Sequence, residues 1–172
     1  MEFPDHPFWD FSLEVYGTEG VAAACLVLQD AHQLDVNIVL CCCWIGASGR
    51  GALDGGETAA VAEWHGDVVR GVRAVRQRLK GGLAPAPLDL SEPLRRRIAK
   101  IEVDLEHVEQ LMLAPTIDRP VDPGAGAERR AVDAAANVDR YFSSIGRTPS
   151  DNDRAAIETV LAASLRAGVA LR

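Results

Sequence analysis

Hydrophobic residues recur at helical spacing along almost all of the 172 residues, and no stretch shows the alternation typical of a β-strand. This pattern predicts an all-α fold of about seven helices in a single domain, residues 1–172. Gly and Pro clusters, together with residues suited to cap helices, set the expected boundaries. The predicted helices cover residues 7–16, 19–32, 36–47, 57–80, 91–113, 128–145 and 150–168.

The helix predicted at 36–47 is apolar on every side, with Asp35 as its N-cap. A helix without a polar face belongs at the centre of a bundle. Three of the four cysteines, Cys41 to Cys43, are consecutive, so their side chains point about 100° apart and cannot share one metal or pair readily. We interpret them and Cys25 as small buried hydrophobic residues in a reducing compartment.

The two longest helices, 57–80 and 91–113, are predicted to form an antiparallel hairpin with coiled-coil-like packing. Each carries an apolar stripe with residues three and four apart. Ser91 is the predicted N-cap of the second helix, with Pro93 just inside it. The stripes consist of Val61, Trp64, Val68, Val72, Val75 and Leu79 on the first helix, and Leu94, Ile98, Ile101, Leu105, Val108 and Met112 on the second.

Two segments are predicted to be irregular. The glycine-rich stretch 46–56 is not a phosphate-binding loop, because no Lys-Ser/Thr pair follows its glycines and no strand precedes it. The stretch 114–127 contains three prolines and two glycines and predicts a mobile linker before the two C-terminal helices. Neither segment carries the pattern of a catalytic nucleophile, and we predict no catalytic residue.

The histidines are scattered, and we predict no metal site and no cofactor. The nearest approach to a carboxylate-histidine motif is Asp104-x-x-His107, with Glu63 and His65 on the preceding helix. If the hairpin pairs Trp64 with His107, then Asp67, Asp104 and His107 come together. That grouping supplies only half of a di-iron motif.

Charge is distributed unevenly. The net charge of −7 argues against bulk nucleic-acid binding, and residues 1–56 hold eight anions but one cation, Arg50. In contrast, residues 67–100 hold nine cations and three anions. With the pairing above, Arg70 can meet Glu102, but Arg76 lies opposite Arg95 and Arg96, so the loop end of the hairpin is expected to be basic.

Two interpretations of this basic face stay open. Its arginines either pair with the acidic N-terminal helices of the same molecule or form a docking surface for an acidic protein or RNA. The aromatic N-terminal region offers a similar choice, between core packing and an exposed anchor for a partner. The candidate partner surface comprises Arg70, Arg73, Arg76, Lys80, Arg95, Arg96 and Trp9.

The N-terminal half resembles a family of small proteobacterial proteins catalogued as a conserved domain of unknown function. The resemblance is carried by Phe8–Tyr16 (FWDFSLEVY), Gly20–Gln29 (GVAAACLVLQ) and Asp35–Leu40 (DVNIVL), followed by Cys43-Trp44-Ile45-Gly46. It continues through Trp64, Val69, Arg73, Arg76, Leu79 and Lys80. It implies a helical fold and a bacterial cytoplasmic setting, and it transfers no catalytic residue.

The leading functional hypothesis is a non-enzymatic helical module that binds another protein, or itself, through the basic hairpin and the aromatic N-terminal region. The alternative is a small-molecule or enzymatic site beside helix 36–47, with Asn37, Cys43, Trp44 and Trp64 as candidate lining residues. Asn37 either seeks a partner there or bonds the first-turn backbone. No signal peptide and no run of about 20 apolar residues is visible, so we expect a soluble cytoplasmic protein without a membrane span.

Overall fold

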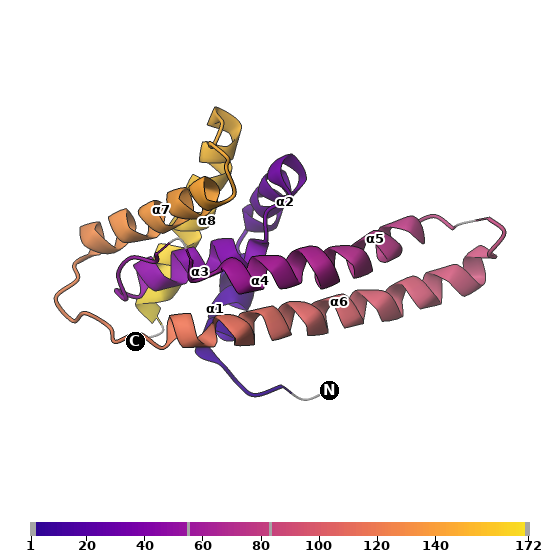
Figure 1. The fold of residues 1–172 in the computed structure, drawn as a ribbon, viewed down its shortest axis with the longest axis horizontal. Coiled ribbons are helices and arrows are strands. Elements are labelled where there is room, and N and C mark those ends of the chain that lie inside the picture. Colours follow the sequence, from indigo (N-terminus) through magenta and orange to yellow (C-terminus); the bar gives the residue numbers. More distant parts are fainter. Residues whose placement is uncertain (1–2, 55, 83, 171–172) are drawn as a thin grey trace.

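The computed structural model describes residues 3–54, 56–82 and 84–170, and these residues form helices and no β-sheet. The predicted all-α fold is confirmed. Seven helical rods can be distinguished, because α4, a π-helical segment and α5 follow one another without a break (Figure 1). The elements are α1 (Pro7–Tyr16), α2 (Val21–His32), α3 (Val36–Ala47), α4 (Ala59–Trp64), the π-helical segment (His65–Val69), α5 (Arg70–Arg78), α6 (Leu88–Ile117), α7 (Ala127–Ser144) and α8 (Asp151–Ala170).

Helix α3 is the centre of the structure, as its composition predicts. Eleven of its twelve residues are buried, and it packs against α1, α6, α7 and α8. Its N-cap is Asp35, whose Oδ1 accepts a hydrogen bond of 2.8 Å from the Asn37 N–H. All four cysteines are free and buried, as expected. Among the described helices none has by itself the length and apolar character to cross a membrane; α1 and α2 reach them only as a pair bent by 97°.

The closest helix crossing of the core joins α3 to α7. A Cβ atom added to Gly46 would lie 2.2 Å from the Ala134 backbone nitrogen. Gly46 was predicted both in the helix 36–47 and at the start of the glycine-rich loop; it lies inside α3, where its missing side chain lets the two backbones meet. Asn137, one turn farther along α7, accepts a hydrogen bond from Leu53 N–H and donates to Gly51 O, which fixes the loop that follows α3.

The aromatic N-terminal region belongs mainly to the core. Phe8, Phe11 and Val15 share one face of α1 and are fully buried. The rings of Phe11 and Trp44 meet edge to face, with centroids 4.9 Å apart. Packing on α3, one of the two roles considered for this region, therefore accounts for its phenylalanines.

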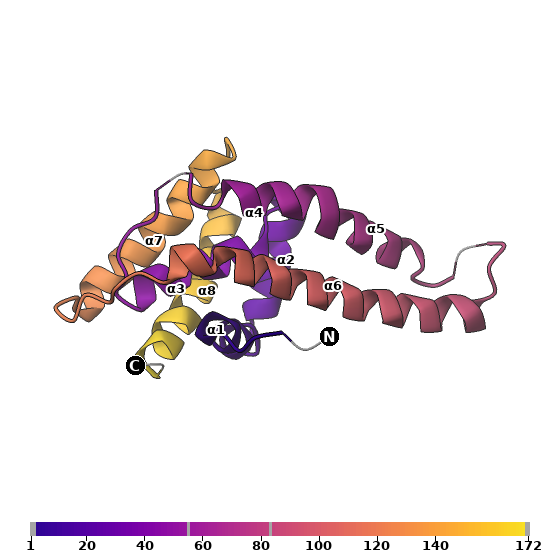
Figure 2. The ribbon, with the colours of Figure 1, turned by 60° about the horizontal axis from the view of Figure 1, so that its bottom comes forward.

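The rod formed by α4, the π-helical segment and α5 lies beside α6 and runs in the opposite direction (Figures 1 and 2). Its inner end packs on the core, whereas its outer end projects away from the other helices. On that outer part the predicted apolar stripes are not sealed, since Val75, Leu94 and Ile101 are each about half exposed. The outer helices are joined instead by ion pairs between Arg73, Arg76 and Glu102.

The π-helical segment determines which residues of this rod face inward. Its turn closes through a hydrogen bond from Arg70 N–H to His65 O, so it holds more residues than an α-turn. Residues four apart drift about 40° per step in a regular α-helix, and the wider turn reduces this drift. Val61, His65 and Val69 are consequently all buried. The predicted stripe through Trp64 and Val68 was therefore wrong in register.

Several helix boundaries differ from the expected ones. α2 begins after Gly20, while the hydroxyl of Thr18, its expected cap, donates to Glu14 O in the preceding helix. α6 begins at Leu88, which places Ser91 inside the helix rather than at its cap.

The C-terminal end of α6 also lies beyond its expected position. α6 continues to Ile117, into the predicted linker, and the segment after it is tied to the glycine-rich loop by a hydrogen bond from Asp122 N–H to Gly49 O. The start of α8 agrees with the predicted helix 150–168, and there Ser150 and Asp153 cap each other's backbone N–H groups.

The α3–α7 crossing yields a stability prediction. We expect Gly46→Ala to lower the free energy of unfolding by about 2 kcal/mol or more, because the added methyl group forces the α7 backbone away. Gly71→Ala is the matched control: its Cβ would meet open space in α5, so it should stabilise by about 0.5–1 kcal/mol. Urea denaturation of both variants measures the difference, and equal values would contradict the close crossing.

Candidate functional site

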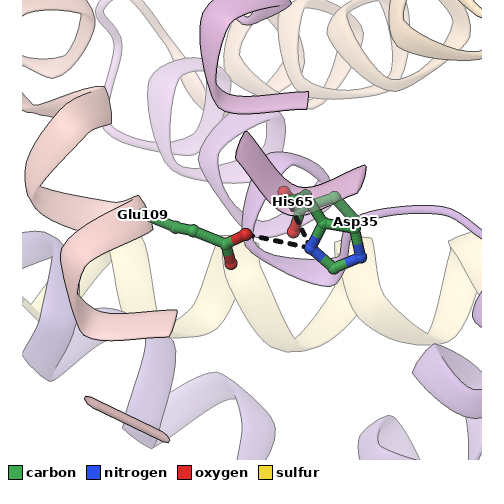
Figure 3. Close-up of side chains that lie close together, drawn as sticks. All are labelled: Asp35, His65 and Glu109. Carbon is green, nitrogen blue, oxygen red and sulfur yellow. Dashed lines mark hydrogen bonds and ion pairs between the residues drawn. The ribbon is translucent and has the colours of Figure 1, made fainter. Parts of the chain in front are cut away.

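Three buried titratable side chains from distant parts of the sequence meet beside the beginning of α3. Nδ1 of His65 lies 2.9 Å from Oε1 of Glu109 and 3.5 Å from Oδ2 of Asp35. In Figure 3, the Glu109 side chain reaches toward the imidazole, and Asp35 approaches the same nitrogen. One donor atom from each residue lies within 4.8 Å of the other two. We call these three residues the Asp35–His65–Glu109 cluster.

Each member is held by its helix. Asp35 is the N-cap of α3, so its Oδ1 is bound to the backbone and its Oδ2 is left to face His65. The wide turn of the π-helical segment directs His65 inward, and Glu109 projects from α6. The Asn37 amide donates to Oε2 of Glu109 at 2.6 Å and accepts from the Gln110 amide at 2.8 Å. The hydroxyl of Tyr141 accepts the Asp35 N–H at 3.1 Å.

Burial dominates the electrostatics of the cluster. It raises the pKa of Asp35 well above its usual range, and the negative charge of Glu109 raises it further, against the opposing effect of His65. Burial also raises the pKa of Glu109, although the hydrogen bond from Asn37 opposes this. The pKa of His65 is lowered by burial, with Asp35 acting in the other direction. The two carboxyl groups therefore resist ionisation unless a cation compensates them.

The cluster lies at the polar end of a cavity of about 360 Å³ between α1, α3, α6 and the rod that precedes α6. Most of its lining surface is apolar, and Asp35, Asn37, His65 and Gln110 are among the polar residues that border it. His65 also borders two further cavities, of about 300 and 200 Å³. The 360 Å³ cavity is lined by Trp9, Ser12, Leu13, Tyr16, Gln29, Asp35, Val36, Asn37, Leu40, His65, Arg73, Val103, Glu106 and Gln110.

The four pocket residues predicted from sequence lie in different environments in the structure. Asn37 lines this cavity, and its side chain bonds Glu109 and Gln110 rather than the first-turn backbone. Cys43 and Trp44 lie in the core of the bundle, and burial raises the pKa of the Cys43 thiol to about 12. Trp64 is half-buried at the end of α4, next to His65.

The metal-like grouping considered from sequence is wrong in its partners. The His107 ring stacks on the indole of Trp9, with centroids 4.0 Å apart and planes 5° apart. Asp67 is exposed, so it does not join His107 in a buried site. The histidine that meets two carboxylates is His65, and its partners come from the α3 cap and α6.

The expected basic surface is also partly corrected. Arg73 binds Glu102 and Glu106, each at 2.7 Å, and Arg76 binds Glu102 as well. These arginines are neutralised by α6, not by the N-terminal helices, and Arg76 does not simply face other arginines. The remaining members of the candidate surface differ in environment: Arg70 donates to Gln33, Arg95 binds Glu92 at 2.7 Å, Lys80 and Arg96 are exposed, and Trp9 is half-buried against His107.

Sequence reasoning missed Glu109 altogether and considered His65 only within a different grouping. Asp35 was recognised as a cap, and Asn37 as a polar residue in need of a partner, which is the one sequence signal that leads to the site. A search for the partner of Asn37 on the hairpin would have included Glu109 and Gln110. The π-helical register could not be read from residue spacing.

Comparison with known proteins gives a family but no activity. A family model described as "Protein of unknown function (DUF2390)" matches residues 7–113. The matched range contains all three residues of the Asp35–His65–Glu109 cluster, and it includes every residue that carries the resemblance found in the sequence. No curated protein and no solved structure matches the chain.

The ion pairs of α5 and α6 can be tested by stability. We expect Arg73→Met to lower the free energy of unfolding by about 2 kcal/mol, because Glu102 is left buried with one arginine fewer. Arg78→Met, an exposed arginine of the same helix, should change it by less than about 0.5 kcal/mol. Urea denaturation measures the free energy of unfolding of both variants, and an equal change would show that the ion pairs of Arg73 do not stabilise the fold.

Proposed function

Because the chain belongs to the DUF2390 family, described as proteins of unknown function, we propose a function from the site itself: the protein binds a small molecule in the 360 Å³ cavity beside α3. The observation that carries the proposal is the combination of a mainly apolar cavity with a cluster of buried titratable groups at one end. A cavity of a few hundred Å³ with a few convergent polar groups is the usual form of a small-molecule site.

The wall and the polar end have different roles in this proposal. Trp9, Leu13 and Tyr16 on α1 face Val103 on α6 across the cavity, so they supply the apolar contacts that hold the body of a ligand. Asp35 and His65 offer hydrogen-bonding groups to its polar end. Groups with perturbed pKa values in a cavity are typical of sites that move protons. The same cluster therefore gives the site the means for acid–base chemistry.

The setting included in the proposal is the bacterial cytoplasm. The four free, buried cysteines support a reducing compartment.

A neutral apolar fluorophore, N-phenyl-1-naphthylamine, tests the cavity. We expect saturable binding with one site per chain. Val103→Phe should weaken it by roughly tenfold, since the larger side chain occupies part of the cavity and each 1.4 kcal/mol is a factor of ten. Val132→Phe, at an exposed position of α7, is the matched control and should leave the affinity unchanged. Equal affinities in the two variants would reject the cavity as the binding site.

Protein interaction is a second candidate, favoured by the outer end of the hairpin. Leu88, Leu90 and Leu94, in the first turns of α6, are about half exposed or more. Exposed apolar residues grouped on a projecting element are typical of an interface. The occupant that we favour is a second copy of the chain, because apolar helix surfaces can cover one another about a two-fold axis.

Sedimentation equilibrium distinguishes this candidate. We expect a concentration-dependent dimer that the double substitution Leu90→Glu with Leu94→Glu converts to a monomer. The control Leu13→Glu changes an exposed leucine on α1, away from the hairpin end, and should leave the dimer intact. A wild-type chain that is monomeric at all concentrations would contradict self-association.

A further inference from the structure

We infer that the Asp35–His65–Glu109 cluster binds a divalent transition-metal ion, such as Zn²⁺ or Mn²⁺. The inference deepens the proposed function, since it names the group that would occupy the polar end of the same cavity. It rests on the geometry of the three donors, on two unpartnered polar atoms beside them and on the balance of buried charge.

The distances between the donor atoms suit a metal ion. Zn²⁺ lies about 2.0–2.2 Å from histidine nitrogen and carboxylate oxygen. With such bond lengths, the separations of 2.9 and 3.5 Å between Nδ1 of His65 and its two carboxylate partners correspond to ligand–metal–ligand angles of roughly 90° and 115°. These angles fall in the range between octahedral and tetrahedral coordination. The two carboxylate oxygens lie within 4.8 Å of each other, and side-chain rotation would bring both onto one ion together with Nδ1 of His65.

Two buried oxygens, one within the cluster and one beside it, have no hydrogen-bond partner among the described residues. One is Oδ2 of Asp35, the oxygen that faces His65. The other is Oε1 of Gln110, an acceptor on a side chain that is 4 % exposed and lines the same cavity. Buried acceptors are rarely left unsatisfied. A cation in the cluster would satisfy the Asp35 oxygen directly, and a metal-bound water would be a donor for Gln110.

The charge balance points in the same direction. Asp35 and Glu109 are 2 % and 0 % exposed, yet the nearby Arg73 already binds Glu102 and Glu106. Within the cluster, as far as the described residues show, the His65 imidazole is the only basic group. A divalent ion would balance both carboxylates, which burial otherwise makes difficult to ionise.

The surroundings have two further features of a metal centre. Asn37 and Gln110 form a chain of hydrogen bonds that fixes the second oxygen of Glu109, as outer-shell residues do for metal-binding carboxylates. Asp35 and His65 also border the cavity, so a fourth position would be open toward it. Three protein donors with one open position are typical of metal ions that bind a water or a substrate. The imidazole donor favours zinc or another transition metal over Mg²⁺ or Ca²⁺.

The test is titration of the full-length, chelator-treated chain with ZnCl₂, MnCl₂ and MgCl₂ by isothermal titration calorimetry. We expect one Zn²⁺ or Mn²⁺ per chain, weaker or no binding of Mg²⁺, and a higher Tm with the bound ion. Glu109→Gln, His65→Gln and Asp35→Asn should each reduce the affinity by more than roughly 100-fold, and Asn37→Ala by roughly 10- to 100-fold. Asp35→Asn keeps a good helix cap, and circular dichroism checks that each variant is folded.

Asp104→Asn is the matched control, because this carboxylate is on α6 but is neither in the cluster nor among the residues that line the cavity. Its metal affinity should stay within about threefold of the wild type. The inference is overturned if the wild-type chain binds neither Zn²⁺ nor Mn²⁺, or if the cluster variants bind as well as Asp104→Asn. Metal binding without fluorophore binding would support the metal site and reject the proposed small-molecule function. Fluorophore binding without metal binding would reject the metal site and support the small-molecule function.

Discussion

The structure depends on the complete burial of α3. A helix with no polar face can be stabilised only if apolar surface covers it on all sides, and α1, α6, α7 and α8 provide that cover. Several polar groups meet α3 where its backbone begins and needs capping. Asp35 and Asn37 are at that point, so the demand for burial also determines where the candidate site lies.

The π-helical segment provides the second feature of the candidate site, because it carries the His65 imidazole that lies beside Asp35. In a regular α-helix, Val61, His65 and Val69 would be spread over about 80° of the helix surface, because residues four apart drift about 40° per step. The wider turn keeps all three buried in the same direction. π-Helical turns are rare and are found frequently at functional sites, which agrees with the position of His65 between three cavities.

Much of the fold could be predicted from residues that act locally. The all-apolar run 36–47, its Asp35 cap and the Ser150–Asp153 capping pair are each decided by a few neighbouring side chains. The candidate site could not be predicted in this way, because it depends on the register between separate helices. Arg76 meets Glu102 instead of Arg95 and Arg96, and His65 meets Glu109, so these contacts are displaced from the expected pairing by roughly one to two turns. Such a shift replaces every partner across the hairpin, so Asp67 and His107 were grouped wrongly and Glu109 was not considered.

The packing of α3 against α7 and α8 has a consequence for how the family relates to folding. The family match ends at residue 113, whereas one side of the central helix is covered by residues 127–170. Residues 7–113 alone would leave Gly46, Ala47 and their neighbours on that side in contact with water. The segment matched by the family model is thus smaller than the set of helices that covers α3. In this chain, α7 and α8 complete the apolar cover of a helix that belongs to the matched segment, although they carry none of the candidate site's three principal residues.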